Sequence, residues 1–541
     1  MNKQLRSGGA ALAVTASLLS GGLAGCTKDL DRTPFYDLNT ESVYKDPANY
    51  VQVLAKLYAG FNLSGNSGSP DVFAGQKKDE GETSYLRAYW YLQELTTDEA
   101  VVAWNSGPLQ ELNRTTWSSS NDLINNSYTR IFYEVTLCNE FIRETTDDKL
   151  SGRGIAGADA DAARLDRAEA RFLRALAYYH ALDLYANVPF VTEADAPGKN
   201  LPKQIKRADL FAYIESELKA IEPLLKAPRQ GPYGRADQGA AQTLLAKLYL
   251  NAEVYTGTAR YTDCLTYCNK VLAGGYALAP QYRFLFLADN NVTSAAEIIF
   301  PITNDGLVSQ GYGGTTYLVH AQVGDSMVAK NFGINGGWFG NRTRKNLPLL
   351  FAGGAASADS RAMFFTRGHT LEIKDLTASN NGYATTKWKN VTSTGKPGSD
   401  PQGNFVDTDF PMFRLGDVYL MYAEAVQRGG QGGTPAQALT YVNALRDRAY
   451  NNTGGRTAGR VTAADVASPD FILAERGREL YWEGTRRTDL IRFGKFTSAS
   501  YLWPWKGGVA AGQGVSPNLN IFPLPSTDIV ANPTLTQNPG Y

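Results

Sequence analysis

Apolar residues recur every three or four positions along much of the chain, which is the spacing of one face of a helix. The clearest case is the segment 161–190, whose apolar positions are Leu165, Ala168, Phe172, Leu176, Tyr179 and Leu182. Its charged residues fall largely on other faces, and Asn187 and Pro189 end the pattern. The spacing predicts a long amphipathic helix here.

The same spacing predicts a chain of further helices. Three of them are strongly periodic: 237–255, 414–429 and 469–496, the last with a break near Gly484. Weaker patterns cover 47–61, 84–97, 121–146, 207–225, 259–273 and 435–448. Several of these helices come in pairs with short links, and alanines punctuate their aromatic faces. Such pairs resemble tetratricopeptide (TPR) hairpins, so we expect a mainly α fold, a TPR-like helical superhelix.

Between residues 275 and 409 the helical pattern stops, and Gly, Asn, Ser and Thr dominate. We expect a long, irregular, loop-rich insert with at most short strands, and loops of this length usually serve a function. Inside it, "GINGGWFGN" (333–341) places Trp338 and Phe339 among four glycines. A loop aromatic either folds back onto the core or faces solvent as a contact surface. We expect the glycines to supply the backbone freedom that presents Trp338.

The N-terminus predicts a lipid anchor. Lys3 and Arg6 precede a small, apolar run that is too short to span a membrane, and "LAGC" ends at Cys26. This is the pattern of a bacterial lipoprotein box, so residues 1–25 are predicted to be a cleaved signal peptide and Cys26 the lipidated residue. An ordinary signal peptide with a chance cysteine is the alternative. Residues 26–541 are expected to form a single domain on a lipid tether.

Composition narrows the classes of function. The chain has 53 basic and 53 acidic side chains, and removal of the signal leaves 51 and 53, a net charge of about −2. Nucleic acid as a partner would need a basic excess, and we expect none. The chain has three histidines, far apart, while Cys264 and Cys268 are one helical turn apart with no histidine near them. We therefore expect small buried thiols, no metal site and no cofactor.

Six blocks in order carry a resemblance to a known family. They are "GCTKDLDRTP", "RAEARFLRALAYYHALDLYANVPFV", "LLAKLYLNAE", "FRLGDVYLMYAEAV", "ERGRELYWEGTRRTDLIRFGKF" and "FPLPSTDIVANPTLTQNPGY". Together they resemble the SusD/RagB family of outer-membrane nutrient-binding lipoproteins from Bacteroidetes. The resemblance implies TPR-like helix pairs with a variable insert over one face. It also implies a cell-surface location at the outer membrane and a SusC-like TonB-dependent transporter as partner. It implies binding of polymeric nutrients, and no catalysis.

Two charged clusters look reactive but are interpreted as structural. Arg486, Arg487, Asp489 and Arg492 lie on a predicted helix beside apolar residues, which favours ion-paired packing. Glu475, Glu479 and Glu483 repeat every four residues, interleaved with Arg478 and Arg486. This repeat is typical of an ion-paired helix face rather than of a glycosidase carboxylate pair. Trp482, inside the same block, is assigned to the core.

A narrower resemblance suggests the ligand. "ELTTDEAVVAWNSGPLQELNRTTW" (94–117) resembles the stretch that carries sugar contacts in the starch-binding branch of the family. It implies stacking of a sugar on Trp104 and Trp338, with an arc completed by Tyr312 in preference to Tyr317. Arg87 and Asn105 are the expected hydrogen-bonding partners. An aromatic ring covers the apolar face of a pyranose while polar side chains bind its hydroxyls, and a curved α-glucan suits an arc of rings.

The sequence therefore leaves three hypotheses about the function. The first is a surface lipoprotein that binds a glycan, in particular a starch-like α-glucan. The second is a member of the same family that binds another glycan or a peptide. The third is an enzyme such as a glycosidase, which the charged clusters do not support.

Overall fold

The computed structural model describes residues 40–64, 81–195, 198 and 200–541. Cys26 and the predicted signal peptide lie outside these residues. The chain divides into two units, Met1–Asn49 and Tyr50–Tyr541. The described part of the first unit holds the short helix α1 (Thr40–Tyr44) and the first two residues of α2 (Ala48–Gly60), and the second unit holds the other elements.

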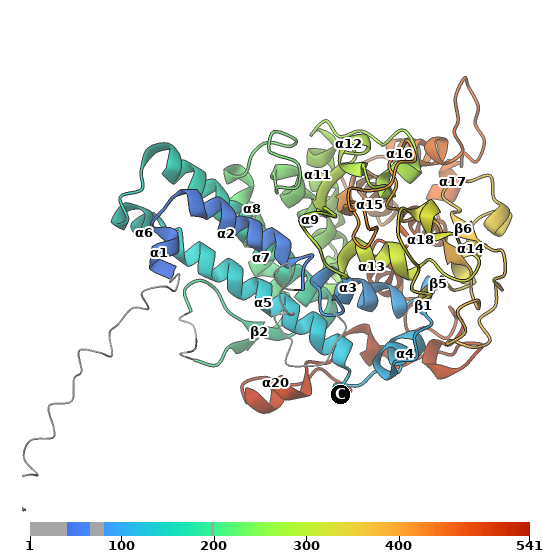
Figure 1. The fold of residues 1–541 in the computed structure, drawn as a ribbon, viewed down its shortest axis with the longest axis horizontal. Helices are drawn as coiled ribbons and strands as arrows, with labels where there is room; N and C mark the ends of the chain where they lie inside the picture. The colour runs from blue at the N-terminus through green and yellow to red at the C-terminus, as the bar shows by residue number, and fades with distance from the viewer. Residues whose placement is uncertain (1–39, 65–80, 196–197, 199) are drawn as a thin grey trace, which may run out of the picture. The chain divides into compact units, whose positions relative to one another are not determined.

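Helices build the scaffold of the large unit (Figure 1). The longer ones are α2 (Ala48–Gly60), α5 (Asp122–Glu144), α7 (Gly157–Tyr185), α8 (Arg207–Ile221), α9 (Gln238–Leu250), α11 (Tyr261–Leu272), α15 (Leu415–Gln427), α16 (Pro435–Ala449) and α18 (Pro469–Leu480). Successive members pack on one another in the order α5, α7, α8, α9, α11, α15 and then α16 and α18. This stacking of neighbouring helices confirms the predicted mainly α, TPR-like superhelix.

Shorter helices connect these long helices or lie within the insert. They are α3 (Tyr85–Trp90), α4 (Gly107–Arg114), α6 (Asp147–Gly152), α10 (Ala252–Thr256), α12 (Asn290–Thr293), α13 (Gly314–Ala321), α14 (Asn346–Leu349), α17 (Ala463–Val466), α19 (Arg486–Arg492) and α20 (Ser526–Ala531). Short turns of π-helix (η2) or 3₁₀-helix (the others) are also present: η2 (Tyr91–Leu95), η3 (Glu222–Leu224), η4 (Tyr282–Phe286), η5 (Ala329–Phe332), η6 (Gly354–Ala356), η7 (Lys506–Gly508) and η8 (Pro517–Asn520).

Several predicted helices change form near their ends; the one predicted at 237–255 divides into α9 and α10. The segment predicted at 84–97 is α-helical only to Trp90 and continues as the π-helical turn η2. The segment predicted at 469–496 divides into α18 and α19, as the glycine near 484 suggested. At this break Trp482 has a left-handed φ of +62° and Gly484 one of +73°. Trp482 is nevertheless fully buried, which confirms its assignment to the core.

The strands of the described residues are short and form four antiparallel pairs. The pairs are β1 (Ala100–Val102) with β5 (Asn341–Thr343), β2 (Val188–Phe190) with β3 (Lys203–Ile205), β4 (Ile298–Ile302) with β8 (Phe410–Arg414), and β6 (Phe364–Phe365) with β7 (Ala384–Thr385). The β4–β8 pair joins the beginning and the end of the long insert, so that the insert leaves and re-enters the scaffold at one place. The β1–β5 pair joins the insert to the segment that follows η2.

A network of buried charges ties α18 to the insert. The Glu479 carboxylate binds Arg361 at 3.0 Å and Arg414 at 2.7 Å, and it also pairs with Arg448. Arg414 in turn reaches Glu483 at 2.7 Å. Burial opposes ionisation, but the three arginines hold the pKa of Glu479 well below its usual range. The predicted ion-paired face exists, but it is buried, and the main partners of Glu479 come from outside α18.

The predicted partners Arg478 and Arg486 behave differently from each other. Arg478 does pair with Glu475, at 2.8 Å. Arg486 lies beyond the break after α18 and instead binds Asp98 through Nε and Nη2, both at 2.8 Å. The break therefore directs Arg486 away from the glutamate repeat, which a continuous helix would not have done.

Replacing Glu479 by Gln should lower the free energy of unfolding by about 3–5 kcal/mol, because three buried arginines would lose a common counter-charge. The measurement is urea unfolding of both proteins at neutral pH. Glu372→Gln is the matched control, since it breaks an exposed pair with Lys345 and should cost less than about 1 kcal/mol. Equal losses in the two variants would contradict the structural role given to the network.

Candidate functional site

Three aromatic residues from distant segments meet where β1 and β5 pair. The pairing continues past the end of β1, where the Ala103 amide donates to the Gly340 carbonyl at 2.9 Å. Beyond it, the Trp104 indole Nε1 donates to the Trp338 carbonyl at 2.9 Å. The backbone register thus brings Trp104 and Trp338 together although they are 234 residues apart in sequence.

The loop that carries Trp338 is fixed along its backbone. The amides of Trp338, Phe339 and Gly340 donate to carbonyls at the end of α13 and just beyond it, at distances of 2.9, 3.1 and 2.9 Å. The Trp338 indole stacks on the His320 ring, with centroids 4.7 Å apart and planes 22° apart. Three consecutive amide hydrogen bonds and a stacked ring leave this loop little freedom to rearrange.

The glycines of this loop are needed for space more than for backbone freedom. Gly333 does have a left-handed φ of +71°. A Cβ on Gly337 would lie 2.1 Å from the Val323 carbonyl oxygen, and one on Gly340 would lie 2.9 Å from the Trp104 indole. The expected conformational role therefore holds for Gly333. At Gly337 and Gly340 the missing side chain allows close packing instead.

Tyr312 completes the group, which we call the ring triad: Trp104, Tyr312 and Trp338. The Tyr312 ring meets the Trp338 ring edge to face, with centroids 6.0 Å apart. The backbone of Tyr312 is held by Arg87, whose Nη1 donates to its carbonyl at 3.3 Å. All three rings of the triad are partly exposed, so they offer aromatic surface to solvent.

Arg87 and Tyr317 lie behind the ring triad. The Arg87 guanidinium lies over the Tyr317 ring at 4.6 Å and the Trp104 ring at 5.6 Å, and its Nε donates to the Tyr91 hydroxyl at 2.8 Å. Burial raises the pKa of Tyr91 to about 12, which keeps this acceptor neutral. Arg87 is 1% exposed and Tyr317 fully buried. The structure therefore places both residues where they position the rings, while Asn105 is exposed beside Trp104.

Three neighbours of the triad were not predicted from the sequence. The His320 ring stacks on the Trp338 indole. Burial lowers the pKa of His320, which favours the neutral imidazole. Phe405 packs against Tyr312 with centroids 5.1 Å apart. Phe339 is 48% exposed, has a left-handed φ of +55° and lies over Gly324. His320 and Phe405 carry no local pattern that points to this site.

The clusters that looked reactive are occupied by structural contacts. Asp489 binds Arg476 and Arg492, each at 2.8 Å. Arg487 donates to the carbonyls of Leu519 and Asn520 instead of joining an ion pair of the cluster. In the described part of the chain, no three His, Cys, Asp or Glu side chains gather closely enough to hold a metal ion. Among the same residues, no helix has the length and apolar character to cross a bilayer.

Two buried carboxyls, those of Glu94 and Glu99, accept hydrogen bonds from the turn between α18 and α19. The Gly484 amide donates to Glu94 at 2.7 Å, and the Trp482 amide donates to Glu99 at 3.3 Å. Burial, and then the charge of Glu99, raise the pKa of Glu94 well above its usual range. Burial raises the pKa of Glu99 to about 8, although Arg486 opposes the shift. The folded protein therefore keeps protons here that the unfolded chain releases.

Comparison with known proteins identifies the family. A family model described as the SusD family matches residues 337–541, and a model described as "Starch-binding associating with outer membrane" matches residues 71–250. The "Starch-binding protein SusD" of Bacteroides thetaiotaomicron is 35% identical over 98% of both chains. The chain belongs to the SusD family. The resemblance proposed from the six sequence blocks is thereby confirmed.

Solved structures agree with the fold of this SusD-family chain. A "SusD-like carbohydrate binding protein" from Bacteroides fragilis covers 92% of the chain and is itself covered completely, with a TM-score of 0.70 and 21% identity. "Surface glycan-binding protein A" from Bacteroides fluxus covers 91% of the chain, with 99% of its own length matched, a TM-score of 0.67 and 17% identity. At these identities the likeness concerns the fold, and it confirms the predicted architecture.

The raised pKa of Glu99 predicts a pH dependence of stability. Between the ordinary glutamate value of 4.5 and about 8, the folded state holds a proton that the unfolded state has lost. Stability from this group is therefore complete below about pH 4.5 and falls as the pH rises to about 8. In Glu99→Gln, the loss of unfolding free energy between pH 5 and pH 8 should shrink by on the order of 2–4 kcal/mol.

Urea unfolding of parent and variant at both pH values measures this difference. Because Glu134 also has a pKa raised by burial to about 8, the parent slope should decrease in Glu99→Gln without vanishing. Identical slopes in the two proteins would show that Glu99 is ionised in the folded state.

Proposed function

We propose that this protein is a surface lipoprotein that binds a starch-like α-glucan and passes it to a TonB-dependent outer-membrane transporter. The observation that carries the proposal is the ring triad, in which Trp104, Tyr312 and Trp338 come together on a fixed backbone with aromatic surface open to solvent. The chain is proposed to act by binding, without catalysis.

The chemistry of the triad suits a sugar polymer. A pyranose has an apolar C–H face that stacks on an aromatic ring, and hydroxyls around its edge that need polar partners. Tyr312 and Trp338 meet at an interplanar angle of 65°, so the rings form a bent surface rather than a flat row. A bent surface fits the curved outline of an α-glucan helix better than an extended, flat glycan.

Asn105 and Arg87 are proposed to support hydroxyl recognition in different ways. Asn105 is exposed next to Trp104 and can reach a bound sugar directly. Arg87 and Tyr317 are buried, so we propose that they act by holding Trp104 and Tyr312 in place. The names of the family model and of the 35% identical relative, both of which refer to starch, favour an α-glucan over other ligands.

The membrane side of the proposal rests on the sequence and the family. Cys26 is proposed to carry the lipid, which would hold the chain at the outer membrane with its binding surface outside. The family-model description "associating with outer membrane" supports this location. A SusC-like TonB-dependent transporter is the proposed partner, because a binding protein without a channel of its own must pass its ligand to one.

Replacing Trp338 by Ala should weaken binding of maltoheptaose by roughly 30-fold, since a stacking aromatic at a binding centre contributes on the order of 2 kcal/mol. Because the Trp338 ring is partly exposed and not enclosed in the core, the melting temperature should fall only slightly. Trp104→Ala should weaken binding as strongly but lower the melting temperature as well, because its ring packs on Gly340 and Tyr317. Titration calorimetry and melting curves on the same samples measure both effects.

Trp505→Ala is the matched control, since Trp505 is another partly exposed tryptophan whose Nε1 donates to a carbonyl, that of Ile373. It should bind maltoheptaose as the parent does. A parent protein that binds a β-linked glucan or a peptide but not maltoheptaose would favour the second hypothesis of the sequence analysis. A Trp338→Ala variant that binds normally would show that the ligand lies elsewhere.

The proposed lipid anchor predicts where the parent protein and the Cys26→Ala variant fractionate. The parent should fractionate with the outer membrane and co-purify with a TonB-dependent transporter in mild detergent. Cys26→Ala should appear in the soluble fraction, because the tether is lost while the folded body is unchanged. A Cys26→Ala protein that stays with the membrane would contradict the lipid anchor, and repeated isolation of the parent without a transporter would contradict the partnership.

A further inference from the structure

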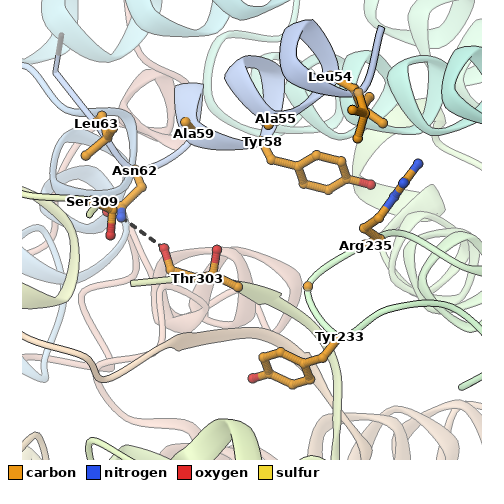
Figure 2. Close-up of a pocket in the computed structure, with 12 residues that line it drawn as sticks. Leu54, Ala55, Tyr58, Ala59, Asn62, Leu63, Tyr233, Arg235, Thr303 and Ser309 are labelled. Atoms are coloured by element: carbon orange, nitrogen blue, oxygen red, sulfur yellow. Dashed lines mark hydrogen bonds between the residues drawn. The ribbon is translucent and has the colours of Figure 1, made fainter. Parts of the chain in front are cut away.

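A cavity of about 260 Å³ lies next to the segment that carries Tyr312 (Figure 2). Figure 2 shows α2 on one side of the space and Tyr233 on the opposite side, with Arg235 at one end and Asn62 and Ser309 at the other. Residues of α2 and of the segments 233–235 and 303–309 line the cavity.

Small residues keep this cavity open. Ala55 and Ala59 lie one turn apart on α2 and face the space, where longer side chains would fill it. Gly234, on the opposite wall, has a left-handed φ of +89°, and a Cβ there would lie 3.0 Å from Cγ2 of Thr303. Small residues therefore leave room for the cavity on two of its sides.

The two tyrosines of the cavity are held in fixed positions. The Tyr58 hydroxyl donates to Glu169 at 2.6 Å and accepts from the Ala236 amide at 2.8 Å. The Tyr233 hydroxyl donates to Asp409 at 2.9 Å. Because both hydroxyls are already bonded, the rings offer their apolar surfaces to the cavity, and no ordering is needed before a ligand binds.

Polar groups stand at the edge of the same space, but none carries an uncompensated charge. The Arg235 guanidinium binds Glu169 through Nε at 2.8 Å and Asp166 through Nη2. Within the described residues Nη1 of Arg235 has no hydrogen-bond partner, and the Thr303 side chain is exposed. Since two carboxylates offset the arginine, an anionic ligand gains little here, whereas a neutral ligand rich in hydroxyls finds donors and acceptors.

The cavity and the ring triad share one stretch of chain. Ser309 lines the cavity and Tyr312 belongs to the triad, and three successive Cα–Cα steps span at most about 11 Å. Six residues before Ser309, the Thr303 carbonyl accepts a hydrogen bond from the Asn62 side chain at 3.1 Å. An oligosaccharide of several units is long enough to contact both places.

We propose that this cavity is a second carbohydrate subsite, which takes one neutral sugar ring of the same glycan chain that stacks on the ring triad. Aromatic walls, polar edges whose one charge is offset, and a volume just below the roughly 300–1,000 Å³ of drug-sized ligand sites match a single sugar unit. The inference rests on the proposed function, since the ring triad is proposed to bind the remaining units of the glycan.

The test compares a long and a short ligand of the same linkage. Ala59→Leu fills the recess and Tyr233→Ala removes one wall, so each should weaken binding of maltoheptaose by about tenfold. Maltotriose, which the triad alone can hold, should bind both variants as it binds the parent. Calorimetry on the full chain gives the affinities, and melting curves show whether each variant is folded.

Ala436→Leu is the matched control, because it makes the same change at an exposed position of α16. It should leave both ligands unaffected. If the two cavity variants are folded and bind maltoheptaose like the parent while Trp338→Ala does not, the subsite is rejected and the proposed function stands. If the cavity variants weaken maltotriose as much as maltoheptaose, the cavity is not a separate subsite. If the parent binds neither sugar, the proposed function fails and the subsite with it.

Discussion

The buried carboxylates of α18 impose the constraint on which the rest of the structure depends. An ionised group out of water is tolerable only when opposite charges reach it, so Glu479 requires its three arginines. Arg361 comes from the insert, and Arg414 ends the strand that closes it. Lys387, also from the insert, binds Glu483 at 2.7 Å. An irregular segment with few hydrogen-bonded strands is thus held to a helical scaffold by charge pairing.

The same helix also positions the ring triad. Where α18 ends, the Trp482 amide reaches Glu99, and the Trp90 indole donates to the Trp482 carbonyl at 3.2 Å. Glu99 directly precedes β1, and β1 leads to Trp104. The position of Trp104 therefore follows from contacts that begin at the turn between α18 and α19. Because amides of that turn also donate to Glu94 and Glu99, whose pKa values are raised, these contacts are sensitive to alkaline pH.

Patterns in the sequence predict the helices of the scaffold but not the contacts between segments far apart in the chain. Periodicity located nearly every long helix, and Gly484 indicated the break in the last one, because both signals are local. The β4–β8 pairing joins segments more than a hundred residues apart and has no local signal. Burial of the glutamate repeat was missed for the same reason, since four-residue spacing describes a helix face but not what covers it. The candidate site residues came from family resemblance, and the structure adds that Arg87 and Tyr317 lie behind the rings.

The glycine-rich loop shows how composition can mislead about rigidity. Four glycines around two aromatic residues suggest a flexible segment, yet three successive amides of this loop are hydrogen-bonded to α13 and the turn after it. Gly337 and Gly340 lack side chains because Val323 and Trp104 occupy that space. A loop packed this closely holds its tryptophan in one orientation before any ligand arrives. Since ordering a loop on binding costs free energy, a preformed ring surface leaves more of each weak stacking contact available for affinity. Repeated, weak contacts are what a polymer of identical sugar units offers, so a rigid loop suits such a ligand better than an adaptable one.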